Sequence, residues 1–311
     1  MQVLFDFLIG PFFQIFEAPI FFVEVVIGGM AAGIMYALVA IGFAVIFKAS
    51  GIVNFAQGAM VLFAGLTLVG FLQMGAPLWL ALIATVVVMV ALAYAVERVV
   101  LGPLVNQPLI VLFMATIGLS FVIEGFGELA WGSDVHRLDV GLPRGSFFVG
   151  DIMIDRFHLV AAGSAGALVV AIVLFMQYTK FGRALRAVAD DHQAALSVGI
   201  PLRMIWVITW SIAGVIALVA GVMWGTQAGI QFSLVLIAFK ALPVLILGGF
   251  NSITGAIVAG LIIGVGETVF EVYWGQMMGG ATENWFAYVV AMIFLFFRPQ
   301  GLFGERIIER V

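Results

Sequence analysis

Long apolar stretches recur along the whole chain, and they set the strongest limit on its fold. Each is about 20 residues long, which is the length of helix that crosses the hydrocarbon core of a bilayer. Of the 311 residues, 64% are hydrophobic and only 10% are charged, whereas soluble domains carry about 25% charged residues. Such a chain cannot cover a globular surface with polar groups, so the sequence predicts an integral membrane protein.

The stretches predict an all-α, polytopic transmembrane bundle of about eight to ten spans, in a single domain over residues 1–311. The segment 3–19 is apolar but interrupted by acidic residues and prolines, so it is predicted as an interfacial helix, a partial helix or a further span. The segment 234–249 is short for a span and could be discontinuous. The predicted spans lie at roughly 22–47, 54–73, 78–101, 108–131, 157–178, 204–225, 234–249, 252–274 and 284–298.

Small residues repeat at four-residue spacing in several of these spans, as in Gly29-x-x-x-Gly33 and Gly260-x-x-x-Gly264. Four-residue spacing places them on one helix face, and small side chains there let helices approach closely in lipid. The pattern predicts a tightly packed bundle and says nothing about function.

Charge and motif content exclude several functions. The formal net charge of −4 gives no support for nucleic-acid binding, and the absence of cysteine excludes disulfides and thiolate chemistry. Lys48 is the first cation, so a cleavable signal peptide is not expected. No nucleotide-binding glycine-rich loop and no metal-binding histidine pair occur. We therefore expect a protein that is not an enzyme and has no catalytic residues, cofactor or metal of its own.

The cations predict the orientation in the membrane, because Lys and Arg near span ends favour the cytoplasmic side. With nine spans, Lys48, Arg98, the segment 179–203 and the cations of the C-terminal tail all fall on one side. That side is predicted to be cytoplasmic. The loop 132–156 then falls outside, although its three arginines make it an exception to the bias. The tail cations are Arg298, Arg306 and Arg310.

The segment 179–203 is the most polar long stretch of the chain. Its apolar residues recur at helical spacing, which predicts a short amphipathic helix outside the bilayer, ended by Gly199 and Pro201. One interpretation is a solvated loop whose arginines orient the chain, and the other is a surface helix that docks to a cytosolic partner. Its charged residues include Lys180, Arg183, Arg186, Asp190, Asp191 and Arg203.

Several motifs resemble those of the branched-chain amino acid permeases of ABC importers. Ala194-Ala195-x-x-x-Gly199 is similar to the core of the importer coupling segment, with Gln193 where an acid is common. Gln57 likewise stands where the family often has His. The other similar stretches are Ile52–Gly58 (IVNFAQG), Phe181–Ala187 (FGRALRA), Lys240–Ala256 (KALPVLILGGFNSITGA) and Arg298–Gly304 (RPQGLFG).

This resemblance implies the transmembrane permease subunit of an importer in the bacterial inner membrane. Its implied partners are lipid, a second homologous permease, two cytosolic ATPases that carry the ATP and Mg²⁺, and a periplasmic binding protein. The expected cargo is a branched-chain or other hydrophobic amino acid; urea or short amides, and aromatic or small carboxylates, are alternatives within the family. The residues implied in ATPase coupling are Arg183, Arg186, Asp190, Asp191, Ala194, Ala195 and Gly199.

Polar residues inside spans are candidates for the translocation path, because lipid burial of polar groups is expensive. Thr116, Ser120, Glu124 and Glu128 recur every four residues and therefore share one helix face. That face either looks into the bundle or an aqueous cavity, or its acids are simply solvated near the outer end. Glu267 and Glu271 leave the same two interpretations open.

Lys240 lies within a predicted span, where it could pair with an acid, cap a broken helix or contact a substrate carboxylate. Asn54 is predicted as the N-cap of the following helix, and a gating role is left open for Gln57; both are also included among the candidate path residues with Thr116, Ser120, Glu124 and Lys240. A rival function is an ion-coupled secondary transporter or channel that uses Glu124, Glu128, Lys240 or Glu267. A purely structural membrane subunit is a third, weaker alternative.

Overall fold

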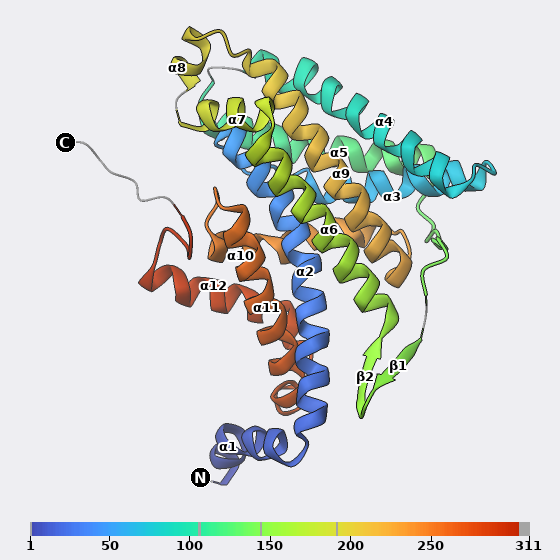
Figure 1. Ribbon diagram of the computed structural model, residues 1–311, viewed down its shortest axis with the longest axis vertical. Helices are drawn as coiled ribbons and strands as arrows, with labels where there is room; N and C mark the ends of the chain where they lie inside the picture. Colours follow the sequence, from blue (N-terminus) through green and yellow to red (C-terminus); the bar gives the residue numbers. More distant parts are fainter. Residues whose placement is uncertain (1, 105–106, 144, 191, 305–311) are drawn as a thin grey trace.

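The computed structural model describes residues 2–104, 107–143, 145–190 and 192–304, and helices make up most of it (Figure 1). A helix covers every predicted span. The helices are α1 (Gln2–Glu17), α2 (Pro19–Ser50), α3 (Gln57–Gln73), α4 (Leu78–Val96), α5 (Leu109–Trp131), α6 (Arg156–Tyr178), α7 (Lys180–Asp190), α8 (His192–Ser197), α9 (Leu202–Ala228), α10 (Ile237–Gly248), α11 (Ile253–Tyr273) and α12 (Phe286–Phe297).

Six of the described helices are long and apolar enough to cross a membrane, so the chain is a multi-pass membrane protein. They are α2, α4 with its extension to Leu104, α5, α6, α9 and α11. Three predicted spans are shorter: α3, the stretch Phe232–Gly248 and α12. The 12 residues of α12 extend only about 18 Å, less than the roughly 30 Å of the hydrocarbon core.

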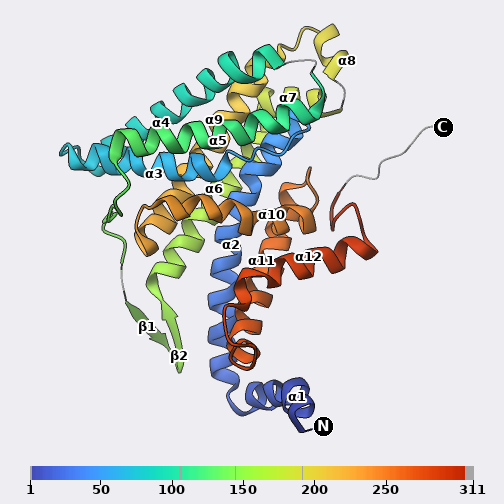
Figure 2. The same cartoon turned by 180° about the vertical axis from the view of Figure 1, so that it is seen from behind.

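The predicted discontinuity near 234–249 is present. A 3-10 turn over Phe232–Leu236 leads directly into α10, which also contains Pro243. At the N-terminus, α1 lies across the end of α2 instead of alongside the bundle (Figures 1 and 2). That position fits the interfacial helix predicted for 3–19 better than a further span.

The long helix α2 forms the centre of the bundle and packs most closely against α11 (Figure 2). Their small-residue faces meet, as the four-residue spacing predicted. A Cβ on Gly33 would lie 2.4 Å from the carbonyl oxygen of Gly260, and a Cβ on Gly264 would lie 2.3 Å from the Cα of Gly33. Only glycine permits this approach of two backbones.

The two ends of α6 lead to different structures (Figure 1). Before α6 stands an antiparallel hairpin of β1 (Ser146–Val149) and β2 (Ile152–Asp155), with Ser146 opposite Asp155. After α6 the chain enters α7. The hairpin adds a small sheet to the predicted all-α fold, and the backbone N–H of Met153 binds Glu24 of α2 at 2.5 Å. We call the two ends of the molecule the hairpin end and the α7 end.

At the α7 end, side-chain contacts join the ends of three long helices. The Arg203 guanidinium lies 2.9 Å from both carboxylate oxygens of Glu97, which begins a π-helical turn at the end of α4. The indole N–H of Trp206 binds the carbonyl of Ala49 near the end of α2 at 3.2 Å. The ends of α2 and α4 and the start of α9 are thereby joined. Arg306 and Arg310 lie outside the described residues.

Candidate functional site

The polar segment 179–203 is helical over α7 and α8, as the spacing of its apolar residues predicted (Figure 1). Its apolar stripe is partly confirmed, because Leu185, Val188 and Ala195 are buried against the bundle. Leu196 and Val198 instead point outward and are 50% and 74% exposed. Together with the exposed cations Lys180 and Arg183, they give the segment an outer face that is both basic and apolar. We call these four residues the outer face of the segment.

Two of the residues implied in coupling have structural roles within the chain. The Arg186 guanidinium donates to the carbonyl of Met176 at 2.6 Å, which ties α7 to the end of α6. Gly199 has a φ of 82° and ends α8. Its N–H binds the carbonyl of Leu196 at 3.0 Å, and the N–H of Ile200 binds that of Ala195 at 3.0 Å, the hydrogen bonds of a Schellman cap.

The structure shows less about the other residues implied in ATPase coupling. Arg183 lies on the outer face. Asp191 and the side chains of Asp190 and Ala194 lie outside the described part of the structure.

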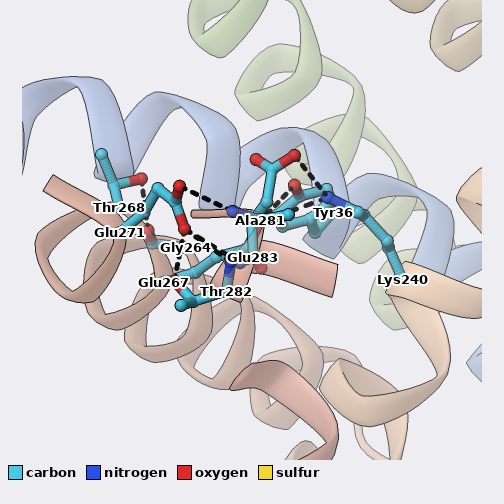
Figure 3. A network of polar contacts seen from close by, with 9 residues as sticks. All are labelled: Tyr36, Lys240, Gly264, Glu267, Thr268, Glu271, Ala281, Thr282 and Glu283. Atoms are coloured by element: carbon cyan, nitrogen blue, oxygen red, sulfur yellow. Dashed lines mark hydrogen bonds and ion pairs between the residues drawn. The ribbon is translucent and has the colours of Figure 1, made fainter. Parts of the chain in front are cut away.

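Three polar side chains from different elements meet around Lys240 (Figure 3). The ammonium of Lys240 lies 3.5 Å from Glu267 Oε1 and 3.9 Å from Glu283 Oε1. The Tyr36 hydroxyl donates to the same Glu267 oxygen at 3.0 Å. The Tyr36 ring stacks on that of Trp224, with 5.7 Å between the ring centroids. The prediction that Lys240 pairs with an acid is therefore confirmed.

The interpretation as a simply solvated acid is wrong for Glu267, whereas Glu271 is partly exposed and also hydrogen-bonded within the chain. Glu267 is only 5% exposed, and its second carboxylate oxygen is buried with no hydrogen-bond partner in the described structure. Glu271 accepts hydrogen bonds from the backbone N–H groups of Ala281, Thr282 and Glu283 and from the Thr282 hydroxyl. It therefore fixes the turn that presents Glu283 to Lys240 (Figure 3).

Asn54, Gln57 and Thr116 are all fully buried, and they form a polar cluster where the turn before α3 meets α5 and α9. The Thr116 hydroxyl accepts from the N–H of Phe55 at 3.3 Å and donates to the carbonyl of Phe113 at 2.9 Å. Gln57 donates to the carbonyl of Ala213 in α9 at 3.4 Å.

The prediction of Asn54 as the N-cap of the following helix is wrong. Ala56 occupies that position, and Asn54 Oδ1 accepts from its N–H at 3.1 Å. Asn54 therefore stabilises the turn before the helix with an Asx-type hydrogen bond.

Ser120 and Glu124 lie on the wall of a cleft of about 540 Å³ between α5, α10 and the 3-10 turn before α10. The Ser120 hydroxyl donates to Glu124 at 2.8 Å. Glu128, one turn further along α5, is exposed and does not line this cleft. The helix face predicted to carry these four residues is therefore not uniform. Thr116 is buried, Ser120 and Glu124 line the cleft, and Glu128 is exposed.

Sequence reasoning missed Tyr36, Glu283 and the aromatic side chains of the cleft. Tyr36 is a polar aromatic residue inside an otherwise apolar span, and that signal could have identified it. Glu283 gives no comparable signal, because it follows the glycines at 279 and 280 outside any predicted regular pattern.

Comparison with known proteins points to the same family as the sequence motifs. Residues 25–298 match the family described as branched-chain amino acid transport system permease component. The chain is 28% identical to the high-affinity branched-chain amino acid transport system permease protein BraD of Pseudomonas aeruginosa, over 93% of this chain and 98% of that protein. It is 27% identical to the corresponding protein LivH of Escherichia coli K12, over 95% and 99% of the two chains.

Among solved structures, PsaBC from Streptococcus pneumoniae in complex with Fab matches with a TM-score of 0.51. The sequence identity is 13%, and the match covers 88% of this chain and 91% of that one. At this identity the match shows a shared fold.

Proposed function

From the premise that this chain belongs to the family of branched-chain amino acid transport permease components, we propose that it is one transmembrane subunit of an ATP-driven importer in the bacterial inner membrane. Its cargo is a branched-chain or other hydrophobic amino acid. The observation that carries this proposal is the family match over residues 25–298, which takes in nearly all of the helices from α2 to α12. Its partners are a second homologous permease, two cytosolic ATPases and a periplasmic binding protein.

The segment of α7 and α8 is the part of the chain that receives motion from an ATPase. Its outer face supports this role, because Lys180 and Arg183 offer charge complementarity while Leu196 and Val198 offer apolar contact. Its inner face is fixed to the bundle by Leu185, Val188 and the hydrogen bond of Arg186. A displacement of the segment therefore moves α6 and α9, between which it lies in the chain.

Transport by the complete complex tests this proposal. The chain is expressed together with ATPases, a second permease and a binding protein from the same genome, and the complex is purified and placed in proteoliposomes. We expect uptake of labelled leucine, isoleucine or valine that requires ATP and the binding protein and persists when ion gradients are dissipated.

Uptake that needs no ATP and stops when ion gradients collapse would instead identify an ion-coupled carrier. Uptake that continues when this chain is deleted would identify a structural subunit. A binding protein that retains urea, short amides or other carboxylates in ligand screening would move the cargo to another class within the family.

A further inference from the structure

We propose that the cleft at Glu124 is a subsite for a hydrophobic amino acid, in which the Glu124 carboxylate receives the ammonium group of the cargo. The inference rests on the proposed function and adds to it the recognition chemistry of one site in this chain. Ser120 acts as a positioning residue, because its hydroxyl holds Glu124 Oε1 at 2.8 Å.

The cleft has the size and lining of a small-molecule site. Its volume of about 540 Å³ falls within the roughly 300–1,000 Å³ of typical ligand pockets, which combine apolar walls with a few polar groups. Beside Ser120, Glu124 and Ser233, the walls are apolar. Five of the lining residues are phenylalanines, namely Phe43, Phe55, Phe121, Phe232 and Phe239. Such walls suit an aliphatic or aromatic side chain, and the single acid suits one positive charge.

The electrostatic setting of the half-buried Glu124 differs from that of the fully buried acids Glu97 and Glu267. Glu97 lies against Arg203 at 2.9 Å, and Glu267 lies against Lys240 at 3.5 Å. Among the described residues no cation forms an ion pair with Glu124, and its hydrogen bond comes from a neutral hydroxyl. A carboxylate inside a spanning helix is expensive without a counter-charge, and an amino acid's ammonium group supplies one when the cleft is occupied.

The absence of cysteine in the sequence allows a site-specific probe. Ser233 is exposed and lines the cleft, so Ser233→Cys introduces a single thiol there. Membrane vesicles with the complete transporter are treated with N-ethylmaleimide, and the labelling rate is measured against the concentration of leucine, valine or phenylalanine. The same titration uses leucinamide, which keeps the ammonium, and 4-methylpentanoate, which is leucine without it.

We expect leucine and leucinamide to protect the thiol, and 4-methylpentanoate to protect it poorly. In the same background, Glu124→Gln should raise the half-protecting leucine concentration about tenfold or more, the change expected when a hydrogen bond to a charged group is lost. Glu124→Asp should retain most of the protection. The matched control is Glu128→Gln on the same helix, which should leave protection unchanged because Glu128 lies outside the cleft.

The proposal is overturned if 4-methylpentanoate protects as well as leucine, if none of the amino acids protects, or if Glu124→Gln leaves protection intact. A thiol that does not react without ligand also overturns it, because the cleft would then be closed to water. The comparison of analogues uses Ser233→Cys alone and decides the question even if Glu124→Gln fails to assemble. If the protection assay fails while amino acid uptake is normal, only the subsite is rejected. If uptake itself is absent, the proposed function is rejected.

Discussion

Among individual residues, Glu267 has its carboxyl group buried inside a helix long enough to span the membrane. It is 5% exposed, and one of its carboxylate oxygens has no partner in the described structure. Tyr36 and Lys240 both contact the other oxygen, so the stability of the charge depends on these two side chains. Burying a charge is tolerable only when it is paired and hydrogen-bonded.

Replacing Lys240 by Met should therefore destabilise the protein strongly. The change leaves Glu267 buried without a cation, and breaking such a pair costs about 3–5 kcal/mol. The low end applies here, because the Lys240 side chain is 27% exposed. Thermal unfolding of the detergent-solubilised protein measures the effect.

The matched control is Glu283→Gln. The Glu283 side chain is 53% exposed. Losing its ion pair with Lys240 should therefore lower the free energy of unfolding by at most about 1 kcal/mol, as for a surface pair. The double variant Lys240→Met, Glu267→Gln should recover part of the stability. Equal effects of Lys240→Met and Glu283→Gln would show that Glu267 does not depend on Lys240.

At the level of elements, the contact of α2 with α11 depends on glycines where the two backbones meet. Gly33→Ala should destabilise the bundle by about 1–3 kcal/mol, the usual cost of overpacking, because the new Cβ would lie 2.4 Å from the Gly260 carbonyl oxygen. Thermal unfolding checks this. The control is Gly28→Ala on the same helix, where a Cβ meets nothing within 4 Å. It should be neutral or stabilising, since Ala favours helix more than Gly, and a similar loss in both variants would contradict the packing argument.

A second prediction at the level of elements concerns the Arg203–Glu97 ion pair, which connects α9 to the end of α4. Arg203 follows the segment of α7 and α8 directly and binds Glu97. Under the proposed function, Arg203→Met should raise the number of ATP molecules hydrolysed per amino acid imported, because motion of the segment no longer reaches α4. The ratio is measured in proteoliposomes.

Lys180→Met is the comparison, because it removes a cation from the same segment without touching this ion pair. It should weaken ATPase association, measured by co-purification, and leave the ratio for assembled complexes near its normal value. An unchanged ratio in Arg203→Met would exclude transmission through the pair.

For the whole molecule, the placement of the hairpin end and the α7 end at opposite ends of α6 predicts opposite sides of the membrane (Figure 1). Single cysteines at Phe148, which is 70% exposed, and at Val198, which is 74% exposed, test this in a chain without native cysteine. A membrane-impermeant thiol reagent should label the Phe148→Cys variant in intact spheroplasts, and the Val198→Cys variant only after the membrane is opened. Labelling of both from one side would refute the orientation and the coupling role of α7 and α8 together.

The sequence by itself determined the membrane class, the position of every helix that covers a predicted span and the polar segment between α6 and α9. These features depend on the length and spacing of apolar residues, which are local properties of the chain. The motifs also identified the family, and the small-residue faces indicated where helices pack closely. Within the candidate site, sequence reasoning found Ser120, Glu124 and Lys240, because polar residues inside apolar spans stand out without any knowledge of their neighbours.

Only the tertiary structure decided what these residues contact. Tyr36 and Glu267 are separated by 231 positions, and no local pattern brings them together. Thr116 and Gln57 are fully buried and Glu124 lines a cleft, although all three were candidate path residues in the sequence. The physical reason is that burial, pairing and cavity shape arise from contacts between distant segments, which periodicity along one helix cannot specify.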